Sequence, residues 1–222
     1  MNRSWILFWL AAVSMLGALS YVLLWLPPEA QQGFVQKIFF FHVPAAFAMY
    51  ICLIVGAIYS CLYLYEKKLN YDQWARATLY VATIFATVVI VSGPIWAKPI
   101  WGVYWTWDPR LTTAFIVFIL LLAYCFVRAL FHDREGLSRR TSIIGAIIAV
   151  LAVLDIPLIH FSVQLWRGIH PSVLRNPEGL PDSFRTGLEV MMLAVFLLAA
   201  HLVDLILRTI KLQDRQEKKL NG

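Results

Sequence analysis

Six long apolar runs constrain the fold of this chain more than any other feature. They lie near residues 5–26, 38–64, 77–96, 111–131, 141–162 and 186–208. Each run is long enough to cross a bilayer as a helix, which takes ~20 residues. Strands of a membrane barrel alternate in polarity over ~10 residues, and these runs do not alternate. The sequence therefore predicts an all-α integral membrane protein, with a single domain of six transmembrane helices over residues 1–222.

The composition leaves little room for a soluble domain. Of the 222 residues, 60% are hydrophobic and 14% are charged, whereas soluble domains average about 45–50% and about 25%. A net charge of +6 could indicate nucleic-acid binding, but the basic residues gather at the ends of the apolar runs. Basic residues in those places orient membrane helices. We therefore expect contact with membrane lipid and none with nucleic acid.

The basic residues divide unequally between the two sides of the predicted membrane. Thirteen of the 19 Lys and Arg residues lie near the termini and in the connections after the second and fourth runs. The other six are Lys37, Lys98, Arg110, Arg167, Arg175 and Arg185. Connections rich in Lys and Arg stay in the cytoplasm, so both termini are predicted to be cytoplasmic. The connections 27–37, 97–110 and 163–185 then face outside.

The outer connection 97–110 is dominated by aromatic side chains. Within eight residues it holds Trp101, Tyr104, Trp105, Trp107 and Asp108. Amphipathic rings of this kind gather at the level of the lipid headgroups. If the segment forms a short interfacial helix, Trp101, Trp105 and Asp108 share one face. That face could form a shelf for a flat, apolar, partly charged ligand.

The ends of this aromatic segment carry helix-boundary signals. The Gly-Pro pair at 93–94 predicts the end of the third helix, and the Lys-Pro pair at 98–99 predicts a break. Asp108 followed by Pro109 is typical of a helix start, with Asp as the N-cap and Pro at the first helical position. Asp108 is therefore either a helix cap or a functional carboxylate. Three tryptophans in seven residues exceed what an aromatic belt needs.

Two histidines lie inside apolar runs, near the outer ends of those runs. His42 lies about four residues inside the second run, and His160 about two residues inside the fifth. At ~1.5 Å per residue, both lie within roughly 6 Å of the outer boundary. Either could simply be satisfied by a carbonyl or by water, but an ionisable residue in a span is a functional hypothesis by default. Imidazole is a good axial ligand of haem iron, and two could bind one iron from opposite faces.

Neighbouring residues bear on the histidine hypothesis. Pro44 and Pro157 stand two or three residues away and can bend the helices. Asp155 lies about one turn from His160 and could orient its ring. His170 in the outer connection could be a ligand in an alternative state, but as a lone loop histidine it is more simply solvated. The outer arginines suit carboxylates such as haem propionates, and no Cys-x-x-Cys-His motif for covalent haem is present.

Three segments resemble those of a known family. The run WGVYWTWDPRLT at 101–112 resembles the WWD signature of haem-handling proteins. The segments FHVPAA at 41–46 and IPLIHFSV at 156–163 resemble the histidine segments that flank this signature. The six-span layout is similar to the CcmC branch of cytochrome c maturation system I, since the CcmF and CcsA branches have more spans. Tyr104 stands where tryptophan is common, and Pro109 where a small residue is expected.

This resemblance implies a function, a location and partners. The chain would bind haem b non-covalently at the periplasmic face of the bacterial inner membrane and deliver it to the chaperone CcmE. Further partners would be the transporter subunits CcmA and CcmB and the small membrane protein CcmD. By the same match, His42 and His160 would be the axial iron ligands. The haem platform would comprise Trp101, Tyr104, Trp105, Trp107, Asp108 and Arg110.

Two other classes of function stay open. A b-type electron-transfer cytochrome is also bis-histidine, but its histidines pair deep in the membrane, and here the pair lies at one edge. A secondary transporter would have internal repeats and a site at the midplane. The sequence has no internal repeat, although the carboxylates Asp155 and Glu189 lie within apolar runs and could belong to such a site. No nucleophile–base pair or His-Glu-x-x-His motif is present, so we expect no independent enzyme activity.

Overall fold

The structure is a computed structural model. The structure describes residues 3–130, 132–133, 136–137, 139–166, 170 and 180–220. In this part of the chain, six helical spans are long and apolar enough to cross a membrane, so the predicted fold class is confirmed. Most of the predicted outer loop 163–185 lies outside the described residues, as do Arg167 and Arg175.

All six spans are helical, and one short hairpin connects two of them. In chain order, the helices before the hairpin are α1 (Arg3–Ser20), the π-helical turn η1 (Tyr21–Trp25), the 3-10 turn η2 (Phe34–Ile38), α2 (Phe39–Glu66), α3 (Leu69–Trp101) and α4 (Pro109–Leu130). After it come α5 (Arg139–Leu154), α6 (Ile156–Trp166) and α7 (Asp182–Leu220). The hairpin pairs β1 (His132–Asp133) with β2 (Gly136–Leu137), which the apolar pattern did not predict because it lies between two spans.

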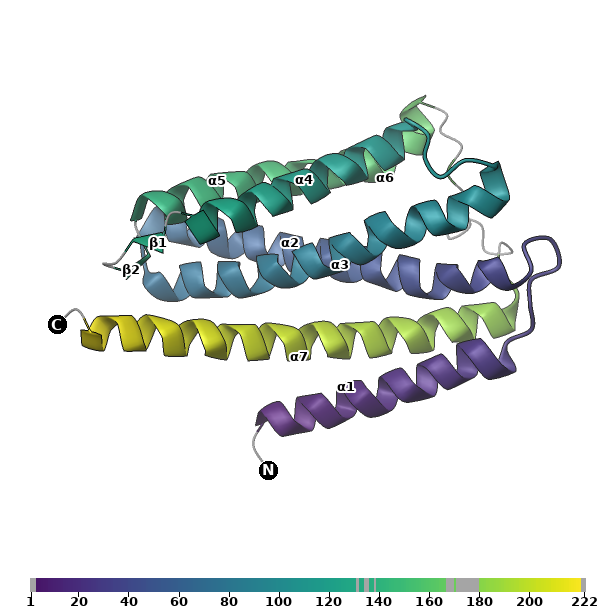
Figure 1. Cartoon of the computed structure of the whole chain (residues 1–222), viewed down its shortest axis with the longest axis horizontal. Coiled ribbons are helices and arrows are strands. Elements are labelled where there is room, and N and C mark those ends of the chain that lie inside the picture. Colours follow the sequence, from purple (N-terminus) through teal and green to yellow (C-terminus); the bar gives the residue numbers. More distant parts are fainter. Residues whose placement is uncertain are drawn as a thin grey trace.

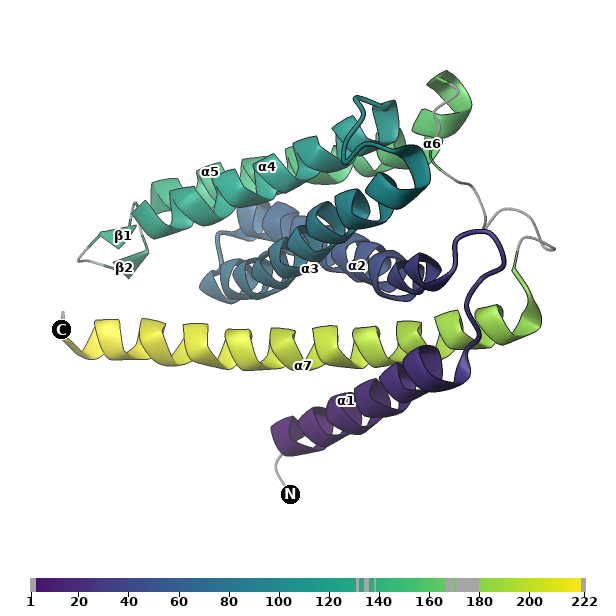
Figure 2. The ribbon, with the colours of Figure 1, turned by 45° about the vertical axis from the view of Figure 1, so that its right-hand side comes forward.

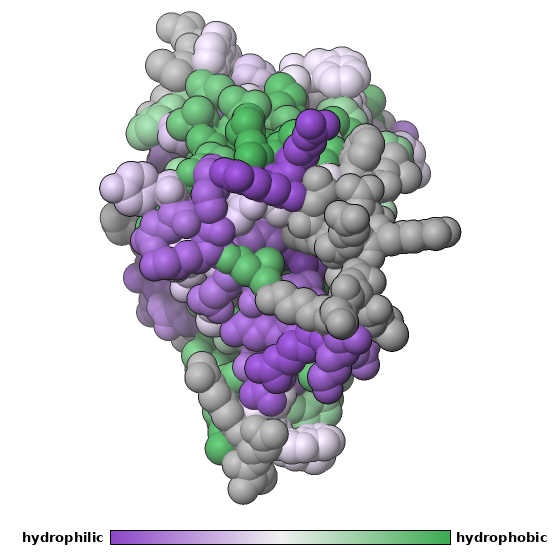
Figure 3. Space-filling view, turned by 90° about the vertical axis from the view of Figure 1, so that its left-hand side faces the viewer, coloured by the Kyte–Doolittle hydropathy of each residue, from purple (hydrophilic) through white to green (hydrophobic). Residues whose placement is uncertain are grey.

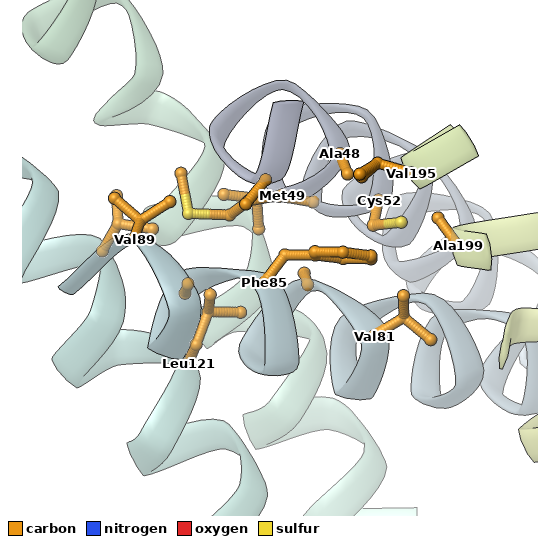
Figure 4. Close-up of a cluster of buried hydrophobic side chains, with 14 of the residues drawn as sticks. Ala48, Met49, Cys52, Val81, Phe85, Val89, Leu121, Val195 and Ala199 are labelled. Atoms are coloured by element: carbon orange, nitrogen blue, oxygen red, sulfur yellow. The ribbon is translucent and has the colours of Figure 1, made fainter. Parts of the chain in front are cut away.

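The helices pack in three layers around a central pair (Figures 1 and 2). The central pair is α2 and α3, which are antiparallel neighbours. On one side lies α7, with α1 packed mainly on α7; on the other lie α4, α5 and α6. Side chains from four helices fill the space between the layers (Figure 4). The labelled members of this core are Ala48, Met49, Cys52, Val81, Phe85, Val89, Leu121, Val195 and Ala199.

The two ends of the bundle match the two groups of connections in the sequence. The α2–α3 turn, the hairpin and the C-terminal end of α7 lie at one end, toward which the N-terminus also points (Figure 1). Hydrophilic side chains gather over this end (Figure 3). The connections before η2 and between α3 and α4 lie at the opposite end, with the start of α7. We call the first of these the polar end. We call the second the tryptophan end, because the connection from Trp101 to Pro109 lies there.

The fifth predicted span is broken, and the third is longer than predicted. Asp155 interrupts the fifth span, so it forms α5 and α6, since Pro157 cannot donate a helical hydrogen bond. In contrast, α3 continues through Pro94 and Pro99, so the predicted end at 93–94 and the break at 98–99 are wrong. Each proline removes only one hydrogen bond, and neighbouring groups in a membrane bundle can satisfy the freed carbonyl.

Buried ion pairs tie the helices together near the polar end. Arg128 of α4 donates two hydrogen bonds to Asp72 of α3, with Nη1–Oδ1 at 3.0 Å and Nη2–Oδ2 at 2.6 Å. Arg128 also donates to Ser142 of α5 at 3.1 Å. Arg76 of α3 lies 3.3 Å from a carboxylate oxygen of Asp214 of α7. These contacts link four of the six spans by charged groups.

Candidate functional site

The hydrogen bond of His42 determines which of its ring nitrogens can bind a metal. His42 lies in the first turns of α2, and its Nδ1 is 2.9 Å from the hydroxyl of Ser92 on α3. The Ser92 hydroxyl donates its proton to the carbonyl of Val88 at 2.6 Å. Ser92 must therefore accept from Nδ1–H. The proton of the neutral ring is then on Nδ1, which leaves the Nε2 lone pair for a ligand such as iron.

Three residues from other segments of the tryptophan end gather near His42. Arg110 of α4 and His170 are both close enough to act electrostatically on the imidazole. The ring of His170 packs edge-to-face on Trp101, with centroids 6.5 Å apart and an interplanar angle of 73°. His42, Trp101, Arg110 and His170 thus come from four separate parts of the chain. The structure brings them together into one site.

His170 is the residue of this group that the sequence did not include in the site. It was considered as a ligand in an alternative state and, more simply, as a solvated loop residue, and the structure places it half-buried against Trp101. Its sequence neighbours carry no helical period and no motif that would mark it. The available signal was its place in an outer connection, on the same predicted side as the tryptophans. Many loop histidines share that signal, so only the packing distinguishes it.

The aromatic segment does not form the short interfacial helix that its spacing predicted. Trp101 is the last residue of α3, and Gly102 follows with a φ of 78°. Glycine adopts this left-handed conformation without strain, which ends the helix. The carbonyl of Gly102 also accepts a hydrogen bond from Lys98 Nζ at 2.8 Å. Trp101, Trp105 and Asp108 therefore do not share a helical face.

The residues after Gly102 form a bent connection with both buried and exposed rings. Trp105 is half-buried and packs edge-to-face on Phe115 of α4, with centroids 5.9 Å apart. Trp107 is 75% exposed and Tyr104 is 62% exposed. In the part of the chain that the structure describes, Nε1 of Trp105 and Oγ1 of Thr106 are buried without a hydrogen-bond partner. The connection thus offers apolar rings and two spare donors.

Asp108 caps α4, as its place before Pro109 predicted. Its Oδ1 accepts a hydrogen bond from the backbone N–H of Arg110 at 2.9 Å. Its backbone carbonyl accepts from the N–H of Thr112, also at 2.9 Å. The residue is 8% exposed, so this capping geometry is held inside the protein. The capping interpretation is confirmed, and a further role for the carboxylate stays a prediction.

His160 is placed differently from His42. It lies on α6, which packs chiefly on α4 and α5, and its side chain is exposed beside the ring of Phe161. Asp155, in contrast, is buried, and both Asp155 and Arg110 act electrostatically on Tyr50 of α2. Oδ2 of Asp155 has no hydrogen-bond partner among the described residues. The role expected of Asp155 in orienting His160 stays a prediction.

The candidate ligands suit a haem iron, which is already bound by the porphyrin macrocycle. Over the described residues, no group of three or more His, Cys, Asp or Glu side chains could hold a bare metal ion. A haem iron, however, needs at most two axial ligands from the protein, because the macrocycle supplies the others. The Nε2 of His42, the half-buried rings and the two donors that lack partners among the described residues fit such a ligand. Arg110 adds a positive charge suited to propionates.

These features define a class of protein. It is an all-helical, six-span membrane protein in which His42, His170 and Trp101 lie together at one end of the bundle. The chain belongs to the CcmC family, since the family profile, described as heme exporter protein C, matches residues 2–221. The resemblance first seen in three segments thus extends over nearly the whole chain.

Curated relatives show the same similarity. Heme exporter protein C of Escherichia coli (strain K12) is 30% identical over 215 residues, which are 93% of this chain and 84% of the relative. The protein of the same name in Bradyrhizobium diazoefficiens is 34% identical over 198 residues, 87% of this chain and 74% of the relative. A putative cytochrome c biosynthesis ccmC-like mitochondrial protein of Marchantia polymorpha is 29% identical over 182 residues, 81% and 73% of the two chains.

Proposed function

We propose that the chain binds haem at its tryptophan end and hands it on during cytochrome c maturation. The relatives are named for haem export and for cytochrome c biosynthesis. The single observation that supports haem binding best is the environment of His42. Its Nε2 is left available by the hydrogen bond to Ser92, and Arg110 and His170 lie nearby.

In this proposal each residue has a separate role. Nε2 of His42 is one axial ligand of the iron. The sequence predicts His160 as the second ligand, whereas the packing supports His170, because His170 acts electrostatically on His42 and lies against Trp101. Arg110 pairs with a propionate. The indole N–H of Trp105 and the hydroxyl of Thr106, which lack partners among the described residues, are further donors for carboxylates.

The exposed rings support delivery of the haem to a partner. Tyr104 and Trp107 project outward, so they can cover one edge of the haem while a partner approaches. We take that partner to be the chaperone CcmE, with CcmA, CcmB and CcmD in the same assembly. The haem is haem b, with no covalent attachment to the protein, and the protein has no enzyme activity of its own. The tryptophan end faces the periplasm, and both termini lie on the cytoplasmic side of the inner membrane.

The ligands can be tested with three alanine variants purified in detergent: His42→Ala, His170→Ala and His160→Ala. We expect the first two to lose haem and to regain part of it when free imidazole occupies the vacated position. His160→Ala should keep the haem content and spectrum of the wild type. If instead His160→Ala loses haem and His170→Ala keeps it, the second ligand is the one that the sequence predicted. Full occupancy with an unchanged spectrum in His42→Ala would contradict the site itself.

A second measurement separates delivery from electron transfer, because both functions use two histidines. Haem-loaded protein is mixed with CcmE, and the haem bound to each protein is followed over time. A delivery protein loses its haem to CcmE, whereas an electron-transfer cytochrome keeps it and cycles between oxidation states. Retention of haem with normal redox cycling would overturn the delivery proposal.

A further inference from the structure

A polar cleft opens at the polar end of the bundle, at the opposite end from His42 and His170. It lies between the first turns of α3 and the last turns of α7, two segments that run side by side in Figures 1 and 2. Its volume is about 290 Å³. The lining residues are Leu69, Asn70, Gln73, Lys211, Asp214 and Arg215. Sites for small molecules range over about 300–1,000 Å³, so this cleft suits a small polar group.

The cleft has a surplus of positive charge. Lys211 and Arg215 are four residues apart on α7 and therefore lie on the same face of the helix. In the part of the chain described here, neither side chain forms an ion pair. The one carboxylate of the lining, Asp214, is 8% exposed and accepts a hydrogen bond from Gln73 at 2.6 Å and from Arg76 at 3.3 Å. Its charge is thus already balanced within the protein.

The start of α3 adds hydrogen-bond donors to the same cleft. The helix begins at Leu69, and the preceding Lys68 has extended backbone angles and makes no side-chain capping hydrogen bond. The first backbone N–H groups of a helix have no partner within it, and the helix dipole makes this end positive. Leu69 and Asn70, which line the cleft, belong to this uncapped turn. Two basic side chains and these N–H groups together favour a phosphate.

Aromatic side chains place the cleft at the boundary of the membrane. Trp74 and Tyr59 are stacked, with centroids 5.4 Å apart and an interplanar angle of 13°. Nζ of Lys211 lies 6.0 Å from the ring centroid of Trp74. Stacked amphipathic rings beside a lysine are typical of the level of the lipid headgroups.

We propose that this cleft binds the phosphate group of an anionic membrane lipid. Lys211 and Arg215 supply the charge, and the first turn of α3 supplies N–H donors. Basic pockets between membrane helices at such a boundary bind anionic lipid headgroups. The bound lipid joins α7 to α3 and adds to the contact between Arg76 and Asp214. The site is separate from the haem site, which lies at the other end of the bundle.

The test uses the full chain in detergent micelles, with dioleoylphosphatidylglycerol as the probe. The lipid retained by the protein is counted by native mass spectrometry, and its affinity is taken from the rise in the unfolding midpoint. Lys211→Gln and Arg215→Gln are each expected to weaken binding about tenfold, the loss of one charge-assisted contact. The double variant should retain no lipid. Lys211→Arg should bind as the wild type does.

The control removes two charges from the same end without touching the cleft: Lys67→Gln combined with Lys219→Gln. Both side chains are exposed, and this double variant should bind the lipid normally and keep its haem. Equal lipid retention by the wild type and the cleft double variant would overturn the proposal. Equal retention of dioleoylglycerol, which lacks the phosphate, would also overturn it. If inorganic phosphate stabilises the wild type while the lipid is not retained, the ligand is a soluble phosphate and the lipid proposal fails.

Discussion

Ser92 has the most specific role of any residue near the proposed site, because it decides where the proton of His42 lies. Ser92→Ala removes the acceptor for Nδ1–H, so either nitrogen can then carry the proton and the ring can turn. Loss of such an outer partner typically lowers metal affinity about 10–100-fold. We expect that loss in a haem titration followed by absorbance, with Ser92→Thr close to the wild type.

A matched control for this prediction lies on the same helix. Thr87 donates its hydroxyl proton to the carbonyl of Thr83 at 2.9 Å, as Ser92 does to Val88, and its side chain is exposed. Thr87→Ala should leave haem affinity unchanged. If Ser92→Ala also leaves the affinity unchanged, the hydrogen bond does not position His42.

At the residue scale, Asp108 has one role that the structure shows, the cap of α4, and one that is only predicted, a functional carboxylate. Asparagine also caps helices well, whereas replacing a cap by alanine costs about 0.5–2 kcal/mol. We expect Asp108→Asn to keep both the stability and the haem transfer of the wild type, and Asp108→Ala to lose stability. The two variants are compared at equal membrane abundance. A stable Asp108→Asn protein that fails to transfer haem would show that the carboxylate itself is needed.

At the scale of elements, the buried pair of Asp72 and Arg128 holds α3, α4 and α5 in register. Removing one partner of a buried pair leaves an unbalanced charge and typically costs about 3–5 kcal/mol. Asp72→Asn should therefore lower the unfolding midpoint in detergent markedly. Removing one partner of an exposed pair costs about 0–1 kcal/mol, so Glu66→Gln, which breaks the exposed contact with Lys68, should have little effect. Similar midpoints for both variants would mean that the buried pair does not organise these helices.

At the scale of the whole molecule, the sidedness of the bundle is the property to test. The structure separates the described connections into two ends, and the sequence assigns thirteen of the 19 basic residues to the termini and to the connections of the polar end. Reporter fusions at residues 70 and 137 and at the C-terminus should report the cytoplasm. Fusions at residues 105 and 175 should report the periplasm. One fusion on the wrong side, in a protein that is otherwise folded, would contradict the proposed location of the haem site.

The features that the sequence determined by itself depend on residues close together in the chain. The six spans follow from apolar length alone, since a membrane accepts only segments that satisfy their own backbone hydrogen bonds. The cap at Asp108 follows from two adjacent residues, and the family follows from three short segments. α3 ends later than the sequence predicted. The expected effect of a proline considers only its own helical turn, and it leaves out the neighbouring groups that can satisfy the carbonyl that the proline frees.

Only the tertiary structure decided which residues of the tryptophan end meet. Ser92 lies 50 residues from its partner His42, and His170 reaches Trp101 from beyond α6. The matched depth of His42 and His160 could be read from the sequence, but depth says nothing about which way a side chain points around its helix. That direction depends on how α2, α3 and α6 pack, and packing between distant segments is set by the shapes of many side chains together. For this reason the sequence could predict the end of the molecule that carries the candidate site, but only the fold shows which of the candidate residues lie together there.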